Sequence, residues 1–161
     1  MLLENKNMIY HRQEQLSRYY LLLCTKMKCS FKLTVDGTSM IPILNPGDSI
    51  VVCPKEEYVV GDILVFYYKN DDLLVHRLLQ TRNGRLLCKG DNSFRMEDIL
   101  PEQIIGAVQL EYDSNRTEDF IAASLQINKI FRKCGYNSDL IRQHPTYIEY
   151  KNKYIEIQKN E

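Results

Sequence analysis

The middle of the chain, from Phe31 to Tyr112, alternates short apolar runs with turn residues. Closely spaced runs rich in Val, Ile, Leu and Tyr are typical of antiparallel β-structure. Asn83-Gly84 is the strongest turn signal, because an Asn-Gly pair favours a two-residue type I′ hairpin. Together with Asn70-Asp71-Asp72, it predicts a three-stranded meander from Asp62 to Lys89. The expected strands cover residues 31–35, 49–53, 62–69, 73–82, 85–89 and 104–112.

A helical pattern precedes this β-rich region. Between Glu4 and Lys28, the apolar residues Ile9, Leu16 and Leu23 recur every seven positions. This period predicts an amphipathic helix that packs its apolar stripe on the domain or on a partner.

A second helix is expected after the β-rich region. Thr117 can cap its first turn, Gly135 stands at its end, and Phe120, Ile127 and Phe131 share one face. For the polar segment from Tyr136 to Glu161, we expect a marginal strand or a partly disordered tail. We therefore expect a single domain that is mainly antiparallel β. Its parts are an N-terminal amphipathic helix over residues 1–30, a β-rich core over 31–113, and a C-terminal helix with a polar tail over 114–161.

Composition narrows the classes of function. Lys plus Arg and Asp plus Glu balance at 21 each, so no net charge attracts nucleic acid or an anionic membrane. The five cysteines are dispersed and form no Cys-x-x-Cys pair. This argues against a zinc site, a redox pair or a disulfide-built secreted domain. We expect neither a metal nor a cofactor.

The N-terminal sequence bears on the compartment. No apolar run approaches the ~20 residues that cross a bilayer, and Glu4, Arg12 and Glu14 interrupt any secretory signal. The cytoplasm is therefore the predicted compartment. Peripheral association of the first helix with a membrane is the alternative.

Ser39 is the candidate nucleophile. It lies between two predicted strands, in a segment where Gly37, Pro42, Pro46 and Gly47 favour sharp turns. The hydroxyl is therefore expected to be presented on a loop rather than buried in a core. Nucleophilic attack by serine needs a base within hydrogen-bond reach, and an imidazole with a pKa of about 6.5 suits neutral pH. An ordinary solvated loop serine is the alternative interpretation.

His76 is the candidate base, because His11 and His144 lie outside the β-rich region. If Asn83-Gly84 forms the two-residue loop, strict pairing places His76 opposite Asp91. An aspartate in that place would orient the imidazole and stabilise its protonated form. We therefore predict Asp91 as the third catalytic residue, although a one-residue bulge would break this register.

Several segments resemble, in the same order, the serine–histidine branch of the signal peptidase I clan. They are Gly37-Thr38-Ser39-Met40-Ile41-Pro42, Gly61-Asp62-Ile63-Leu64-Val65-Phe66, Val75-His76-Arg77, Lys89-Gly90-Asp91-Asn92 and Ile105-Gly106-Ala107-Val108. The resemblance covers about residues 31–112. It implies the antiparallel β catalytic domain that this clan shares with the self-cleaving repressors of the SOS response.

The resemblance also implies roles for individual residues. Ser39 would be the nucleophile, His76 the general base, and Asp91 the orienting acid; other branches of the clan use a lysine as base. In relatives, the acid can also lie several residues later, where this chain has Glu97 and Asp98.

By this resemblance, the chain is expected to be a soluble serine endopeptidase that cleaves a leader or precursor peptide. The peptide would add as an extended strand, with small side chains next to the cut. One alternative is a self-cleaving regulator like the SOS repressors, for which Cys134-Gly135 resembles a cut site. The other alternative is a non-catalytic peptide-binding module of the same fold.

Overall fold

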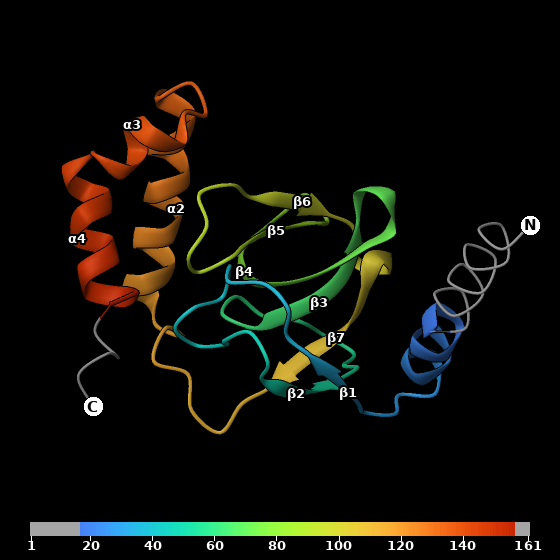
Figure 1. The fold of residues 1–161 in the computed structure, drawn as a ribbon. Coiled ribbons are helices and arrows are strands. Elements are labelled where there is room, and N and C mark those ends of the chain that lie inside the picture. The colour runs from blue at the N-terminus through green and yellow to red at the C-terminus, as the bar shows by residue number, and fades with distance from the viewer. Residues whose placement is uncertain (1–16, 157–161) are drawn as a thin grey trace, which may run out of the picture.

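The computed structural model describes residues 17–156. Seven strands form one sheet in the order β1-β2-β7-β3-β4-β5-β6, and every neighbouring pair is antiparallel. The predicted mainly antiparallel β fold with flanking helices is confirmed (Figure 1). The strands are β1 (Phe31–Thr34), β2 (Ser49–Cys53), β3 (Ile63–Tyr68), β4 (Asp72–Arg82), β5 (Arg85–Lys89), β6 (Glu97–Ile99) and β7 (Ile104–Gln109).

Alternation along β3 explains why this strand lies in the middle of the sheet. Ile63 and Val65 point into one buried cluster, whereas Leu64 and Phe66 point into another on the opposite face. Successive side chains of a strand project to opposite faces, so a strand that is apolar at every position needs cover on both sides. Burial of β3 therefore fixes the positions of its neighbours β4 and β7.

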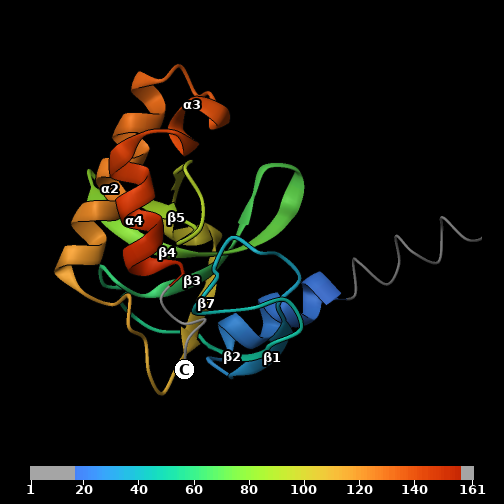
Figure 2. The same cartoon turned by 60° about the vertical axis from the view of Figure 1, so that its left-hand side comes forward.

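Within the described residues, the C-terminal part contains three helices. They are α2 (Glu118–Lys133), α3 (Ser138–Arg142) and α4 (Pro145–Tyr154). The Thr117 side chain accepts a hydrogen bond from the Phe120 N–H, as its predicted capping role requires. Figure 2 shows that these helices lie beside β4 and β5.

The expectation of a marginal strand or disordered tail after Tyr136 is wrong for the described residues. Tyr147 and Tyr150 are buried against α2, in a third apolar cluster that includes Phe120 and Phe131. Their three-residue spacing is helical, and Pro145 at the first turn of α4 favours a helix start. The tyrosines therefore supply the apolar face that the polar composition conceals.

Near the N-terminus, a helix runs through residues 17–26. Its buried residues are Leu21 and Cys24, which join the cluster behind β1 and β2. The predicted seven-residue stripe does not pack on the domain where it is described, because Leu23 is 55% exposed. Ile9 and Leu16 lie outside the described residues. Within residues 17–156, no helix has the length and apolar character needed to cross a membrane.

Candidate active site

Ser39 lies in the loop between β1 and β2, and a second loop holds it in place. Met40 beside it is buried and anchors the first loop in the core. In the loop after β5, the Asn92 N–H donates to the Ser39 carbonyl at 2.8 Å, and its side-chain amide donates to the Thr38 carbonyl at 3.3 Å. A Cβ at Gly90 would lie 2.7 Å from the Ser39 carbonyl oxygen. Glycine is therefore required there for the two loops to approach this closely.

The Ser39 hydroxyl contacts the predicted base. The distance between Ser39 Oγ and His76 Nε2 is 3.0 Å, and His76 on β4 is only 7% exposed. His76 Nδ1 lies 2.7 Å from Glu97 Oε2 on β6. A carboxylate accepts only, so Nδ1 donates to Glu97 and the neutral ring leaves Nε2 free to accept from the serine hydroxyl. Ser39, His76 and Glu97 thus form one continuous hydrogen-bonded chain.

The predicted pairing of Asp91 with His76 is wrong, and a β-bulge is the reason. The β4–β5 register shifts between Leu78 and Gln80. Beyond this bulge Arg77, not His76, lies on the same face as Lys89, with which it pairs. Since side chains alternate, Asp91 two positions after Lys89 falls on the face of Arg77. His76 projects to the other face.

Glu97 lies beside His76 because the pairing of β5 with β6 places Glu97 on the same face of the sheet as His76. Leu78 pairs with Cys88, and Cys88 pairs with Glu97, so the three residues form one row across β4, β5 and β6. His76 lies two residues from Leu78 on the same face. Asp98, the other late acid, points away and pairs with Arg85 at the surface. Of the two acids that the resemblance left open, Glu97 is the one that contacts the base.

Asp91 takes part in a different network. Arg77 Nε and Nη2 donate to the two Asp91 carboxylate oxygens, each at 2.8 Å, and Arg77 also donates to Asp113 and to the Gly61 carbonyl. Arg77 and Asp91 are both fully buried. Burial alone would lower the pKa of Arg77, but the bonds and charges of Asp91 and Asp113 raise it above its ordinary value. The guanidinium is therefore permanently charged and paired.

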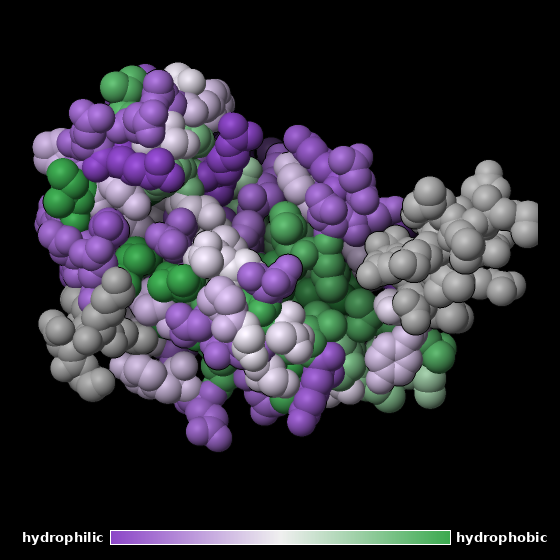
Figure 3. Space-filling model, viewed as in Figure 1, coloured by the Kyte–Doolittle hydropathy of each residue, from purple (hydrophilic) through white to green (hydrophobic). Residues whose placement is uncertain are grey.

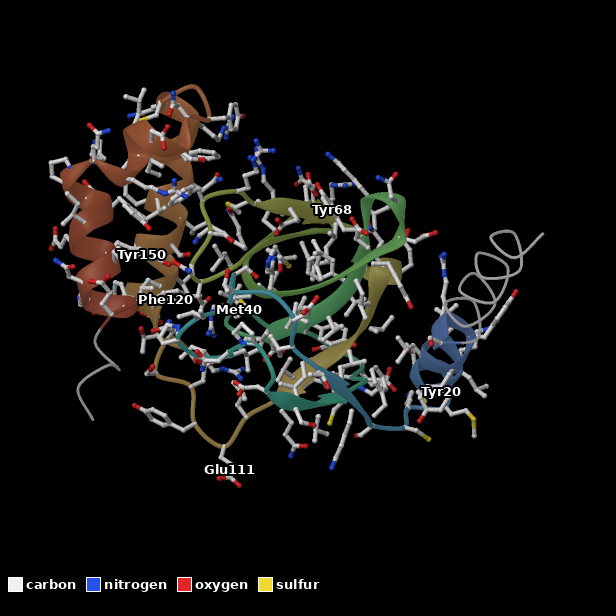
Figure 4. All side chains as sticks on the ribbon, viewed as in Figure 1. Tyr20, Met40, Tyr68, Glu111, Phe120 and Tyr150 are labelled. Atoms are coloured by element: carbon white, nitrogen blue, oxygen red, sulfur yellow. The ribbon has the colours of Figure 1, made fainter. Side chains whose placement is uncertain are left out.

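The same network joins the sheet to the C-terminal helices. The Tyr150 hydroxyl donates to the Asp91 carbonyl at 2.6 Å, and the Arg77 guanidinium lies 5.4 Å from the centre of the Phe120 ring. Figure 4 shows Tyr150 and Phe120 projecting from α4 and α2 at this junction. The helices thus support the loop that follows β5, and this loop in turn holds Ser39 in place.

Lys89 is the second buried cation on this face. Its Nζ donates to the carbonyls of Gly90 and Ser93, at 2.9 and 2.7 Å. Burial lowers the pKa of Lys89 to about 7, although Asp91 and Glu97 oppose the shift. Lys89 therefore closes the loop that holds Ser39, whereas the side chain within hydrogen-bond distance of the Ser39 hydroxyl is His76.

Two hollows flank the Ser39–His76 pair. One, of about 180 Å³, is mainly apolar and has Ser39 and His76 in its wall together with Leu33, Val35 and Leu74. Figure 3 shows a hollowed hydrophobic area on this face of the molecule. The other, of about 570 Å³, is mainly polar and lies toward the C-terminal helices. Among residues 17–156, no cluster of three or more His, Cys, Asp or Glu side chains could hold a metal ion.

Comparison with known proteins adds one match. Residues 4–109 match the Peptidase S24-like family, a span that includes every strand and ends before α2. The three C-terminal helices lie outside the matched region. No curated protein matches the chain.

Proposed function

Because this chain belongs to the Peptidase S24-like family, we propose that it is a serine endopeptidase that cleaves a leader or precursor peptide. The observation that carries the proposal is the hydrogen-bonded order Ser39–His76–Glu97 beside a small apolar hollow. The finer likeness to serine–histidine signal peptidases rests on His76 as the base, because other branches of the signal peptidase I clan use a lysine in this role. The five free cysteines support a reducing compartment, and we place the reaction in the cytoplasm.

The proposed mechanism follows from the contacts of each atom. His76 Nε2 accepts the Ser39 proton while Oγ attacks the peptide carbonyl carbon, and Glu97 stabilises the imidazolium that forms. The Ser39 backbone N–H is the proposed donor to the developing oxyanion, a contact typically worth about 2.7–4 kcal/mol of barrier. His76 then protonates the leaving amine, and it activates a water that releases the acyl group from Ser39.

The apolar hollow suits the residue on the acyl side of the cut. Its walls come from β1 on one side and the start of β4 on the other. An extended peptide fits between such strands, because it continues their backbone hydrogen bonding. Its walls are mainly apolar and its volume is about 180 Å³, so it accommodates one apolar side chain. The preference for a small side chain is what the resemblance to the signal peptidase I clan implies.

Self-cleavage remains the second candidate, because the family fold is also that of self-cleaving repressors. The structure around Cys134-Gly135, the candidate cut site within this chain, argues against self-cleavage and for a separate substrate. Cys134-Gly135 forms the end of α2, where Gly135 has φ +64° and the Tyr136 N–H donates to the Phe131 carbonyl at 2.9 Å. Peptidases bind substrates as extended strands, so cleavage here would require this helix end to unwind.

A peptide-library digest tests the proposal. Incubation with a library of proteome-derived peptides, read by mass spectrometry, is expected to give defined cuts after small apolar residues. Ser39→Ala should abolish them while leaving the fold intact, since a half-buried loop hydroxyl contributes little to stability. Intact mass of the wild-type protein should stay unchanged. Cuts that persist in Ser39→Ala would overturn the proposal, and shortening of the wild-type chain alone would favour self-cleavage.

A further inference from the structure

The polar hollow touches the proposed catalytic chain of residues at two points. Thr38 lies in its wall and precedes Ser39 in the chain. Glu97 also lies in its wall and is the hydrogen-bond partner of His76. The opposite wall comes from the C-terminal helices, with Phe131, Ser138 and Tyr147. One wall of the hollow is therefore built by residues outside the region that matches the family.

Contacts between the loop and the helices keep the hollow formed. The Asn128 side-chain amide donates to the Phe94 carbonyl at 2.8 Å. The Phe94 ring packs edge-on against Tyr147, with the centres 5.1 Å apart. The loop that carries Asn92 and Ser93 is thus fastened to α2 and α4. A ligand would meet a largely preorganised surface, which reduces the entropy lost on binding.

The charges in the hollow favour an acidic ligand. Arg95 and Arg142 both line it, and Glu97 is already engaged by His76. None of the ion pairs among residues 17–156 includes Arg95. Arg142 pairs only with exposed Asp139 at 3.6 Å, a type of surface pair that contributes little. The Phe94 ring lies 5.7 Å from the Arg142 guanidinium and helps to hold it at the rim.

We propose that this hollow binds the leaving-group side of the substrate peptide, and that Arg95 and Arg142 select aspartate or glutamate there. The inference rests on the proposed peptidase function. An extended peptide whose acyl side fills the apolar hollow passes Ser39 and leaves toward Thr38 and Asn92, on the polar side. Guanidinium groups bind carboxylates through paired, charge-assisted hydrogen bonds. The substrate class is therefore a peptide with a small apolar residue before the cut and acidic residues shortly after it.

Matched peptides test this selectivity. A cleaved library peptide is resynthesised with Glu, Gln or Lys at each of the first few positions after the cut. The Glu version should be cleaved roughly tenfold more efficiently than the Gln version, as expected for one charge-assisted bond, mainly through a lower KM. The advantage should shrink at high salt, because the arginines are exposed. Equal cleavage of the Glu and Gln versions at low salt would overturn the proposal.

Variants assign the effect to the hollow. Arg95→Gln and Arg142→Gln should raise KM much more for the Glu peptide than for the Gln peptide, whereas Arg142→Glu should favour the Lys peptide. Arg132→Gln is the matched control, because Arg132 is exposed on α2 but does not line the hollow. If Arg132→Gln raised KM for the Glu peptide equally, general charge attraction would explain the selectivity, and the proposal would be overturned.

A binding experiment separates this proposal from the proposed function. Fluorescence anisotropy with Ser39→Ala and labelled Glu and Gln peptides measures selectivity without catalysis. Preferential binding of the Glu peptide that Arg142→Gln removes would support the acidic subsite whether or not Ser39 is the nucleophile. Equal binding of both peptides would overturn the subsite and leave the peptidase proposal standing.

Discussion

His76 and Arg77 are adjacent on β4, and each pairs with a carboxylate, yet the two pairs differ in almost every other respect. The His76–Glu97 pair borders a hollow and continues to the Ser39 hydroxyl. The Arg77–Asp91 pair is bidentate, fully buried and joined to Asp113 and Asn115. Alternation along one strand thus separates a pair suited to proton transfer from a pair suited to fastening the fold. The comparison predicts that their loss damages different properties.

The largest effect on stability is expected from Asp91→Asn. This change leaves the buried Arg77 charge with Asp113 as its remaining carboxylate. Removing one partner of a buried pair is strongly destabilising, so the free energy of unfolding should fall by about 3 kcal/mol. Denaturant unfolding measures the change.

Asp98→Asn is the control for that variant. The Asp98 side chain is 53% exposed and pairs with Arg85 at the surface, so the free energy of unfolding should change by about 0.5 kcal/mol or less. Equal losses in the two variants would mean that burial does not distinguish these acids.

Lys89 should give the chain an unusual pH dependence. Its pKa is lowered to about 7 by burial, whereas an unfolded lysine titrates near 10.4. Between these values the unfolded chain binds more protons than the folded one. The contribution of Lys89 to the free energy of unfolding should therefore rise between about pH 7 and pH 10, by up to about 1.4 kcal/mol per pH unit. Below pH 7 both states are protonated, and the full cost of burying the charge remains.

Lys89→Met is the variant that isolates this contribution. Methionine nearly matches the length of the lysine stem and cannot be charged. When unfolding free energies are measured across this pH range, their slope against pH should be more positive in the wild-type protein than in the variant. Parallel slopes would contradict the assignment to Lys89.

A smaller effect is expected from Tyr150→Phe. The change removes the hydrogen bond from the tyrosine hydroxyl to the Asp91 carbonyl and keeps the ring. The free energy of unfolding should fall by about 1–2 kcal/mol, because a buried acceptor loses its donor. Thermal unfolding checks this value, with Tyr136→Phe on the exposed turn after α2 as control.

Much of the fold can be predicted from the sequence, because periodic burial leaves a periodic pattern. Short apolar runs between turn residues, together with the Asn83-Gly84 turn, predict the strands β3, β4 and β5, and the structure contains them. Strand β6 has only three residues, two of them acidic, and carries no such pattern. Its role depends on pairing with β5, which is a tertiary effect.

The third residue of the candidate site could not be derived, for a specific reason. The bulge lies at Leu78-Leu79, and both side chains are buried. Two adjacent leucines satisfy either register, so hydrophobicity does not reveal which residue is extra. The resemblance to relatives kept Glu97 among the candidates, but only the register across β4, β5 and β6 distinguishes it from Asp91.

The most direct test of this division of roles compares Glu97→Gln with Asp98→Asn in cleavage of one library peptide. Both variants should remain folded, and stability is measured alongside the kinetics. Glutamine keeps the size of the side chain but removes the charge that stabilises the imidazolium, so kcat should fall by roughly 10²-fold or more with KM little changed. Asp98→Asn should cleave at the wild-type rate. A folded Glu97→Gln protein with wild-type kcat would contradict the assignment of Glu97 as the partner of the catalytic base.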